Sequence, residues 1–251
     1  MALIAEFKSR LENYFAFSGK EVKEVLIATL IASFIFAFNE WGSTTFDFII
    51  GLKNFALIIV LVLLAFFVHL TVQRVVALAI GFKAEFRIWW GGLIAGFVLI
   101  FVTAAIFGFG IPIILPGGMF AAVLVRHRLG EFRYGFNYWE NGVIAALGPI
   151  SNLALAFIFK ISLYIFPQSW FLQKALLINI VFAICTMLPI PPLDGINMFF
   201  AGRTWYFLIF FTIIACSVLI FFTGVILTLI GGAIIAGILS LIYFLTFEQP
   251  P

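Results

Sequence analysis

The chain has 251 residues, of which 65% are hydrophobic and 10% are charged. Soluble domains carry about 25% charged residues, so this composition excludes a soluble globular protein and predicts an integral, multi-pass membrane protein. The net charge of +3 is small and the basic residues form no nucleic-acid-binding patch, so the expected partner is the lipid bilayer and not a nucleic acid.

Residues 1–19 carry apolar and charged side chains at helical spacing, which predicts an amphipathic helix in the membrane interface, ended by Gly19. Residues 20–251 are expected to form a single all-α membrane domain. We expect about six to eight transmembrane or half-spanning segments around a polar cavity. The longer apolar runs lie at residues 25–41, 55–81, 142–166, 171–188, 205–223 and 225–247.

Two shorter apolar pieces, residues 91–107 and 111–125, are separated by Gly108-Phe109-Gly110. One continuous span would place the three arginines between residues 126 and 133 opposite Lys83 and Arg87. A hairpin of two short or half-spanning segments keeps these basic residues on one side, so the hairpin is expected, with a single span as the alternative. The distribution of Lys and Arg then predicts a cytoplasmic N-terminus.

Asp194 follows an apolar run in the sequence L-P-I-P-P-L-D-G at residues 188–195. Prolines interrupt a helix, and a carboxylate within apolar sequence is costly in a membrane, which indicates irregular backbone beside a functional polar cavity. A second interpretation is a turn at the membrane surface, with Asp194 capping the next helix. The residues alone leave both interpretations open.

His69 and Gln73 lie four positions apart in the second apolar run, so they share one face of a helix. A lone histidine on an apolar helix is more often a packed core residue than a ligand. Both His69 and Asp194 fall toward the cytoplasmic ends of their spans, which predicts that they meet in one site. Arg74 is expected to reach the headgroups with its long side chain.

A helix with His69 and Gln73, followed much later by P-I-P-P-L-D-G, resembles the site-2 protease family of intramembrane zinc metalloproteases, most closely its archaeal branch. The likeness extends roughly from residue 60 to residue 202. It includes residues 81–87, L-P-G-G at 115–118, G-P-I-S-N at 148–152 and Asn179. The resemblance implies a bundle of membrane helices around a metal site.

The chain departs from the family's H-E-x-x-H motif. His69 stands at the first histidine, Leu70 at the catalytic glutamate and Gln73 at the second histidine, while Asp194 keeps the third ligand position. Thr186 replaces an asparagine that the family usually has before the proline stretch. The resemblance thus implies a zinc site at His69, Gln73 and Asp194 that holds zinc weakly or not at all. Other positions expected to line the cavity or contact a substrate are Pro191, Pro192, Gly195, Asn152 and Asn179.

The expected function is that of a site-2-protease-like protein without an intact catalytic centre, which binds a transmembrane segment or partner without cleaving it. The first alternative is an active zinc-dependent intramembrane endopeptidase with a replacement base such as Glu85 or Glu140. The second alternative is a channel or transporter that uses the same polar cavity. Zinc content distinguishes the first two, and ion flux in liposomes tests the third.

Overall fold

The computed structural model describes residues 2–42, 46–124 and 138–247. Within these ranges, five helices are long and apolar enough to cross a membrane. They are α3 (Phe48–Ala79), α4 (Trp90–Phe107), α5 (Tyr138–Ile165), α8 (Arg203–Phe222) and α9 (Val225–Phe247). Two further helices, α2 (Gly19–Ala37) and the apolar α6 (Trp170–Thr186), complete the bundle. The expected all-α polytopic membrane fold is confirmed.

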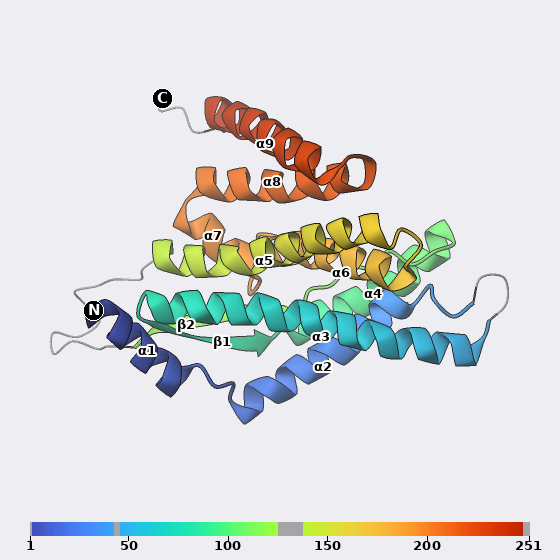
Figure 1. The fold of residues 1–251 in the computed structure, drawn as a ribbon, viewed down its shortest axis with the longest axis horizontal. Coiled ribbons are helices and arrows are strands. Elements are labelled where there is room, and N and C mark those ends of the chain that lie inside the picture. The colour runs from blue at the N-terminus through green and yellow to red at the C-terminus, as the bar shows by residue number, and fades with distance from the viewer. Residues whose placement is uncertain (1, 43–45, 125–137, 248–251) are drawn as a thin grey trace.

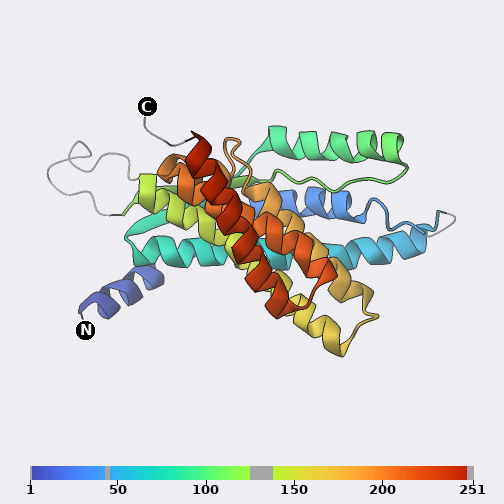
Figure 2. The same ribbon diagram turned by 90° about the horizontal axis from the view of Figure 1, so that it is seen from above.

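The helices lie in layers (Figure 1), with α8 and α9 on one outer side, α5 and α6 in the middle, and α3 and α2 on the other side. Helix α5 packs against α3 and against both α6 and α7 (Asp194–Ala201), so it lies at the centre of the contacts. Seen from above (Figure 2), α9 crosses diagonally over the layers beneath it. The central position of α5 brings the residues of the predicted site together.

The N-terminal helix α1 (Ala2–Tyr14) ends earlier than expected, and Gly19 begins α2 instead of ending α1. The reason is Ser18, whose side-chain oxygen accepts a hydrogen bond from the Glu21 N–H at 3.2 Å and so caps the new helix. The position of α1 in the membrane interface remains a prediction.

A two-stranded antiparallel ribbon, β1 (Phe82–Ile88) and β2 (Gly117–Val123), connects α3 to the return from α4. Because β2 pairs with β1, the chain after α4 comes back to the end from which α4 started, and the expected hairpin is confirmed up to Leu124. The arginines expected on that side after residue 125 lie outside the described residues.

The return leg differs from the short apolar span expected at residues 111–125. Residues 109–116 run back without helix alongside α4, where Gly96 lies against the Ile113 carbonyl oxygen, and β2 follows. Pro112 and Pro116 prevent a helix here. Polar side chains satisfy part of the exposed backbone, since Asn39 bonds to both the N–H and the carbonyl of Gly110.

Arg74 does not reach the headgroups, contrary to the expectation from its place near the end of the span. Its side chain is buried and forms an ion pair with Glu21 of α2, which is buried as well. The N-terminal segment and β1 cover this part of α3, and they give the guanidinium group partners inside the protein. Burial of an arginine therefore follows from a tertiary contact with a residue 53 positions away.

Candidate functional site

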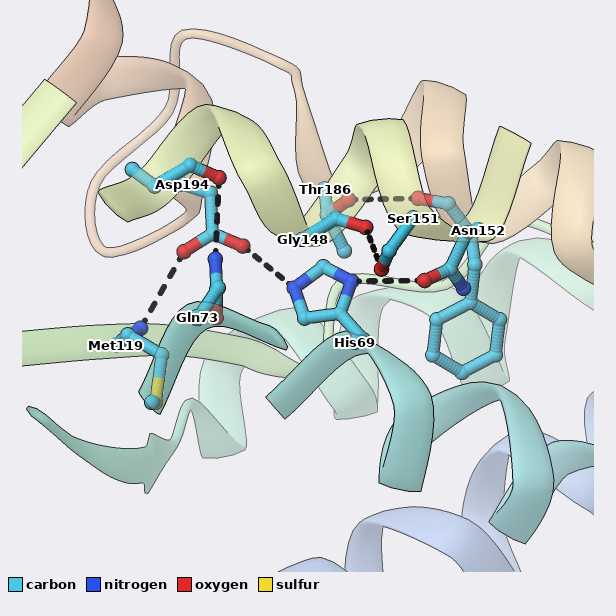
Figure 3. Close-up of polar contacts among 10 residues, drawn as sticks. His69, Gln73, Met119, Gly148, Ser151, Asn152, Thr186 and Asp194 are labelled. Atoms are coloured by element: carbon cyan, nitrogen blue, oxygen red, sulfur yellow. Dashed lines mark hydrogen bonds and ion pairs between the residues drawn. The ribbon is translucent and has the colours of Figure 1, made fainter. Parts of the chain in front are cut away.

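His69 and Asp194 form a direct polar contact in the interior (Figure 3). The Nε2 atom of His69 lies 2.8 Å from Oδ2 of Asp194, and the two residues are only 4% and 1% exposed. His69 comes from the second half of α3, and Asp194 is the first residue of α7. The predicted meeting of these two residues is therefore found.

Asn152 of α5 holds the other side of the imidazole ring. Its Oδ1 lies 3.1 Å from Nδ1 of His69, and its side chain is fully buried. An amide oxygen only accepts, so Nδ1 carries a proton in this contact. On the other side of the ring, Nε2 faces the carboxylate of Asp194. Both ring nitrogens are thus satisfied by protein groups.

The carboxylate of Asp194 also reaches the ribbon. Its Oδ1 accepts a hydrogen bond from the backbone N–H of Met119 in β2 at 3.3 Å (Figure 3). The residue before α7, Leu193, makes no side-chain capping bond, and Asp194 lies inside the helix. Asp194 therefore favours α7 only through its charge at the helix N-terminus, while its oxygens bind β2 and α3. This arrangement fits the polar-cavity interpretation better than the surface turn.

Gln73 is fully buried and binds α5 instead of Asp194. Its Nε2 donates to the carbonyl oxygen of Ala145 at 3.0 Å. Pro149 lies inside α5 and has no N–H to offer Ala145, four residues earlier, so that carbonyl needs another donor. The amide of Gln73 supplies it. Its other atom, Oε1, is buried and has no hydrogen-bond partner among the described residues.

Gly148 allows α5 to approach α3 at this point. A Cβ atom at Gly148 would collide with the ring of His69 and with Nε2 of Gln73. The Gly-Pro pair therefore has two separate consequences, since the glycine gives room for the polar side chains of α3 and the proline frees the carbonyl that Gln73 binds.

A small cavity of about 10 Å³ lies beside the pair, with room for about one water molecule. Its polar lining comes from His69, Gln73 and Thr186. The remaining lining is mostly apolar and includes Leu70, which is 2% exposed and belongs to the main hydrophobic core. Leu70 is thus part of the packed core.

Of the other predicted site residues, Asn179, Pro191, Pro192 and Gly195 lie around this centre without lining the cavity, whereas Thr186 lines it. Asn179 donates to the Ala175 carbonyl oxygen of its own helix at 2.8 Å. Pro191 is exposed, and the carbonyl of Pro192 lies against Gly118 of β2. Gly195 packs against the Met187 carbonyl. Thr186 lines the cavity but donates its hydroxyl to the Phe182 carbonyl oxygen at 2.7 Å.

The donors present do not fit a catalytic zinc ion. His69 and Asp194 offer one imidazole and one carboxylate, and the buried oxygen of Gln73 adds a neutral amide. In the parts of the chain that the structure describes, no group of three His, Cys, Asp or Glu side chains could hold a metal ion. Catalytic zinc sites use three protein ligands and one water molecule. The leucine at position 70 cannot take a proton from such a water.

Glu85 and Glu140, the two glutamates considered as replacement bases, lie away from the cavity. Glu85 lies on β1, is half exposed and pairs with Lys83 at 2.7 Å. The hydrogen bond from Lys83 holds the pKa of Glu85 below its ordinary value, opposite to the rise that suits a general base at neutral pH. Glu140 lies in the first turn of α5. Neither residue lines the cavity.

Three parts of the site were not predicted from the sequence, namely the ribbon, the N–H of Met119 and the ion pair of Glu21 with Arg74. A signal for β1 was present, because Phe82, Ala84 and Phe86 alternate with charged residues and are buried in the fold. The role of the Met119 N–H has no sequence signal, since any residue except proline offers the same donor.

No family model matches the chain, and no solved structure matches it significantly. A protein of Methanocaldococcus jannaschii named "putative zinc metalloprotease" is 36% identical to it over 187 residues. The match covers 73% of this chain and 85% of that protein. At this identity and coverage the two proteins are homologous over most of their length. The chain therefore belongs to the metalloprotease-like family of this archaeal relative.

Proposed function

We propose that the chain is a site-2-protease-like intramembrane protein that binds a transmembrane segment of a partner without cleaving it. The observation that carries this proposal is the direct bond of 2.8 Å between His69 and Asp194. In it, the two strongest metal ligands of the predicted site satisfy each other. The core position of Leu70 supports the same conclusion, because no base is present where the family activates its water.

The polar groups around the pair support a loss of catalysis rather than an open site. Gln73 donates to the carbonyl freed by Pro149, and Asn152 holds the imidazole ring from its far side. Each of these two residues has one contact that stabilises the helix packing without any chemistry, while Oε1 of Gln73 and Nδ2 of Asn152 have no hydrogen-bond partner among the described residues. The proposal explains in this way why polar residues persist in a membrane interior, where unsatisfied groups are costly.

Binding of a membrane segment is supported by the outer face of α4, the proposed binding flank. Helix α4 packs against α2 and against its own return leg, and 22% of its residues are buried, the same share as in α9. Its outward side chains, including Phe97 and Val98, are exposed and apolar. A transmembrane helix matches such a surface, whereas the cavity itself is too small for a peptide.

The second candidate is an active zinc endopeptidase, which is favoured by the name of the M. jannaschii relative. It requires a third ligand and a base that the described donors do not supply. A channel or transporter has less support, because the cavity beside His69 has room for about one water molecule.

The test uses the purified chain in liposomes with fluorescent transmembrane peptides of about 20 apolar residues. A photo-cross-linking amino acid at Phe97 should capture the peptide, while the same group at Phe244, an exposed position of α9, should capture much less. Mass spectrometry should detect no cleaved peptide. Cleavage that disappears in Asp194→Asn would establish the endopeptidase instead, and equal capture at both positions would refute the binding flank.

A further inference from the structure

The rung formed by Phe86 of β1 and Met119 of β2 is held at both outer edges of the ribbon. These two residues are directly opposite each other in the register. The N–H of Phe86 donates to Oε1 of Glu21 at 2.9 Å, and the N–H of Met119 donates to Oδ1 of Asp194 at 3.3 Å. The outward-facing N–H of each residue in this pair therefore donates to a buried carboxylate.

Both carboxylates are held by side chains of one helix. Asp194 contacts His69, and Glu21 forms its ion pair with Arg74, which follows His69 by five residues on α3. Five residues correspond to about 7.5 Å along a helix, so the two holding side chains lie on successive turns. The ribbon is thus fixed to α3 through one carboxylate on each side.

The Arg74 end of this arrangement is fully enclosed. Nη1 of Arg74 donates to the Phe15 carbonyl oxygen at 3.0 Å, and its guanidinium lies 3.9 Å from the centre of the Phe17 ring. Arg74 and Glu21 are 2% and 3% exposed. A buried ion pair adds little net stability compared with apolar side chains, but it specifies one arrangement of the groups around it.

We propose that Glu21 is a positioning residue, which Arg74 holds against the N–H of Phe86 so that Met119, across the rung, meets Asp194. The ribbon thereby closes the cavity next to His69, since Phe86 and Met119 both line it. Nothing in the sequence links Glu21 to the predicted site, which it reaches through Arg74 of α3 and Phe86 of β1. This role is independent of whether the chain cleaves a substrate.

The test is the double variant Glu21→Leu/Arg74→Leu, which leaves no unpaired charge in the interior and removes the acceptor of the Phe86 N–H. Amide hydrogen exchange, followed by mass spectrometry in nanodiscs, should become about tenfold faster or more in residues 82–88 and 117–123. Exchange in α8 and α9 should stay at the wild-type rate. The matched control is Glu24→Leu, because Glu24 accepts the Ile88 N–H at 3.0 Å, at the end of the ribbon and away from Arg74. The control should affect exchange only near residue 88.

A second readout reports on the site itself. The chain has two histidines, so in a His127→Gln background the imidazole ¹⁵N signal belongs to His69 alone. The double variant should shift this signal, because Asp194 loses the fixed Met119 N–H, and Glu24→Leu should leave it unchanged. If the double variant does not fold, Glu21→Met/Arg74→Met decides by the same two readouts, since it also removes the acceptor and both charges but keeps longer side chains in the interior.

The proposal is overturned if the folded variant keeps wild-type exchange in the ribbon and the wild-type signal of His69. It is also overturned if the amide exchange rate rises by the same factor in the ribbon, in α8 and in α9. That result would mean that Glu21 and Arg74 contribute to global stability without positioning the ribbon.

Discussion

Nε2 of His69 lies 2.8 Å from Oδ2 of Asp194, although 125 positions separate the two residues. One comes from α3 and the other from the start of α7, and α5 places Asn152 against the opposite ring nitrogen at 3.1 Å. The pair therefore links three helices of the bundle. In the proposed function, this link is what remains of a metal site after two of its other functional positions became Leu70 and Gln73.

The pair should be energetically coupled. Asp194→Leu leaves Nε2 of His69 and the N–H of Met119 without their partner. We therefore expect the free energy of unfolding to fall by about 2–4 kcal/mol. In the double variant His69→Leu/Asp194→Leu no orphaned imidazole remains. Its loss of unfolding free energy should therefore be smaller, by about 1–3 kcal/mol, than the summed losses of the two single variants. Denaturant unfolding in detergent measures this cycle. Strictly additive losses would mean that the contact contributes nothing as a pair.

Gly148→Ala should separate α5 from α3. The added methyl group meets His69 and Gln73, and overpacking of this kind costs about 1–3 kcal/mol. Gly237→Ala is the matched control, because Gly237 is also within a helix but has nothing within 4 Å of its Cβ position. The control should leave stability unchanged or raise it slightly. Equal effects of the two substitutions in thermal unfolding would contradict the close approach of α5.

Gln73→His should raise zinc binding. The new imidazole would stand beside His69 and Asp194, and its second ring N–H could donate to the Ala145 carbonyl that Gln73 now binds. Gln73→Leu, which removes the amide and adds no ligand, should bind no more zinc than the wild type. Isothermal titration with zinc at neutral pH compares the variants. Addition of Leu70→Glu would then restore a base one residue after His69.

The charge distribution predicts the membrane orientation. Single cysteines at Ser9, Arg87 and Arg203, in a background without Cys185 and Cys216, should react with a membrane-impermeant reagent from the cytoplasmic side. A cysteine at Gln168, in the connection between α5 and α6, should react from the opposite side. Labelling of Arg87 and Gln168 from the same side would refute this topology.

Most spans could be predicted because a long apolar run is a local property of the sequence. The run at residues 225–247 coincides with α9, and residues 205–223 differ from α8 by a few positions. The hairpin at residues 91–125 was predicted only in its direction, since its return leg depends on Pro112 and Pro116 and on pairing with β1. Strand pairing depends on a partner far away in the sequence. The apolar composition of β2 gives no sign of that partner, because it also suits a membrane span.

Within the site, sequence spacing and motif likeness were enough to predict that His69 and Asp194 meet. They were not enough for Arg74, whose burial depends on Glu21 in another helix, nor for Gln73, whose partner is a backbone carbonyl. Asn179 was expected at the cavity and instead donates within α6. The identity of a residue shows what it can bind, whereas tertiary packing decides which partner it meets.

Zinc content decides whether His69 and Asp194 hold a metal, and it is measured in the purified wild-type chain by elemental mass spectrometry after dialysis against a buffer that contains a fixed concentration of free zinc. His69→Ala and Glu85→Gln serve as the site variant and the surface control. We expect well under one zinc per chain in all three proteins, because His69 and Asp194 bind each other and no third strong ligand adjoins them among the described residues. One tightly held zinc per wild-type chain, lost in His69→Ala and kept in Glu85→Gln, would contradict this expectation.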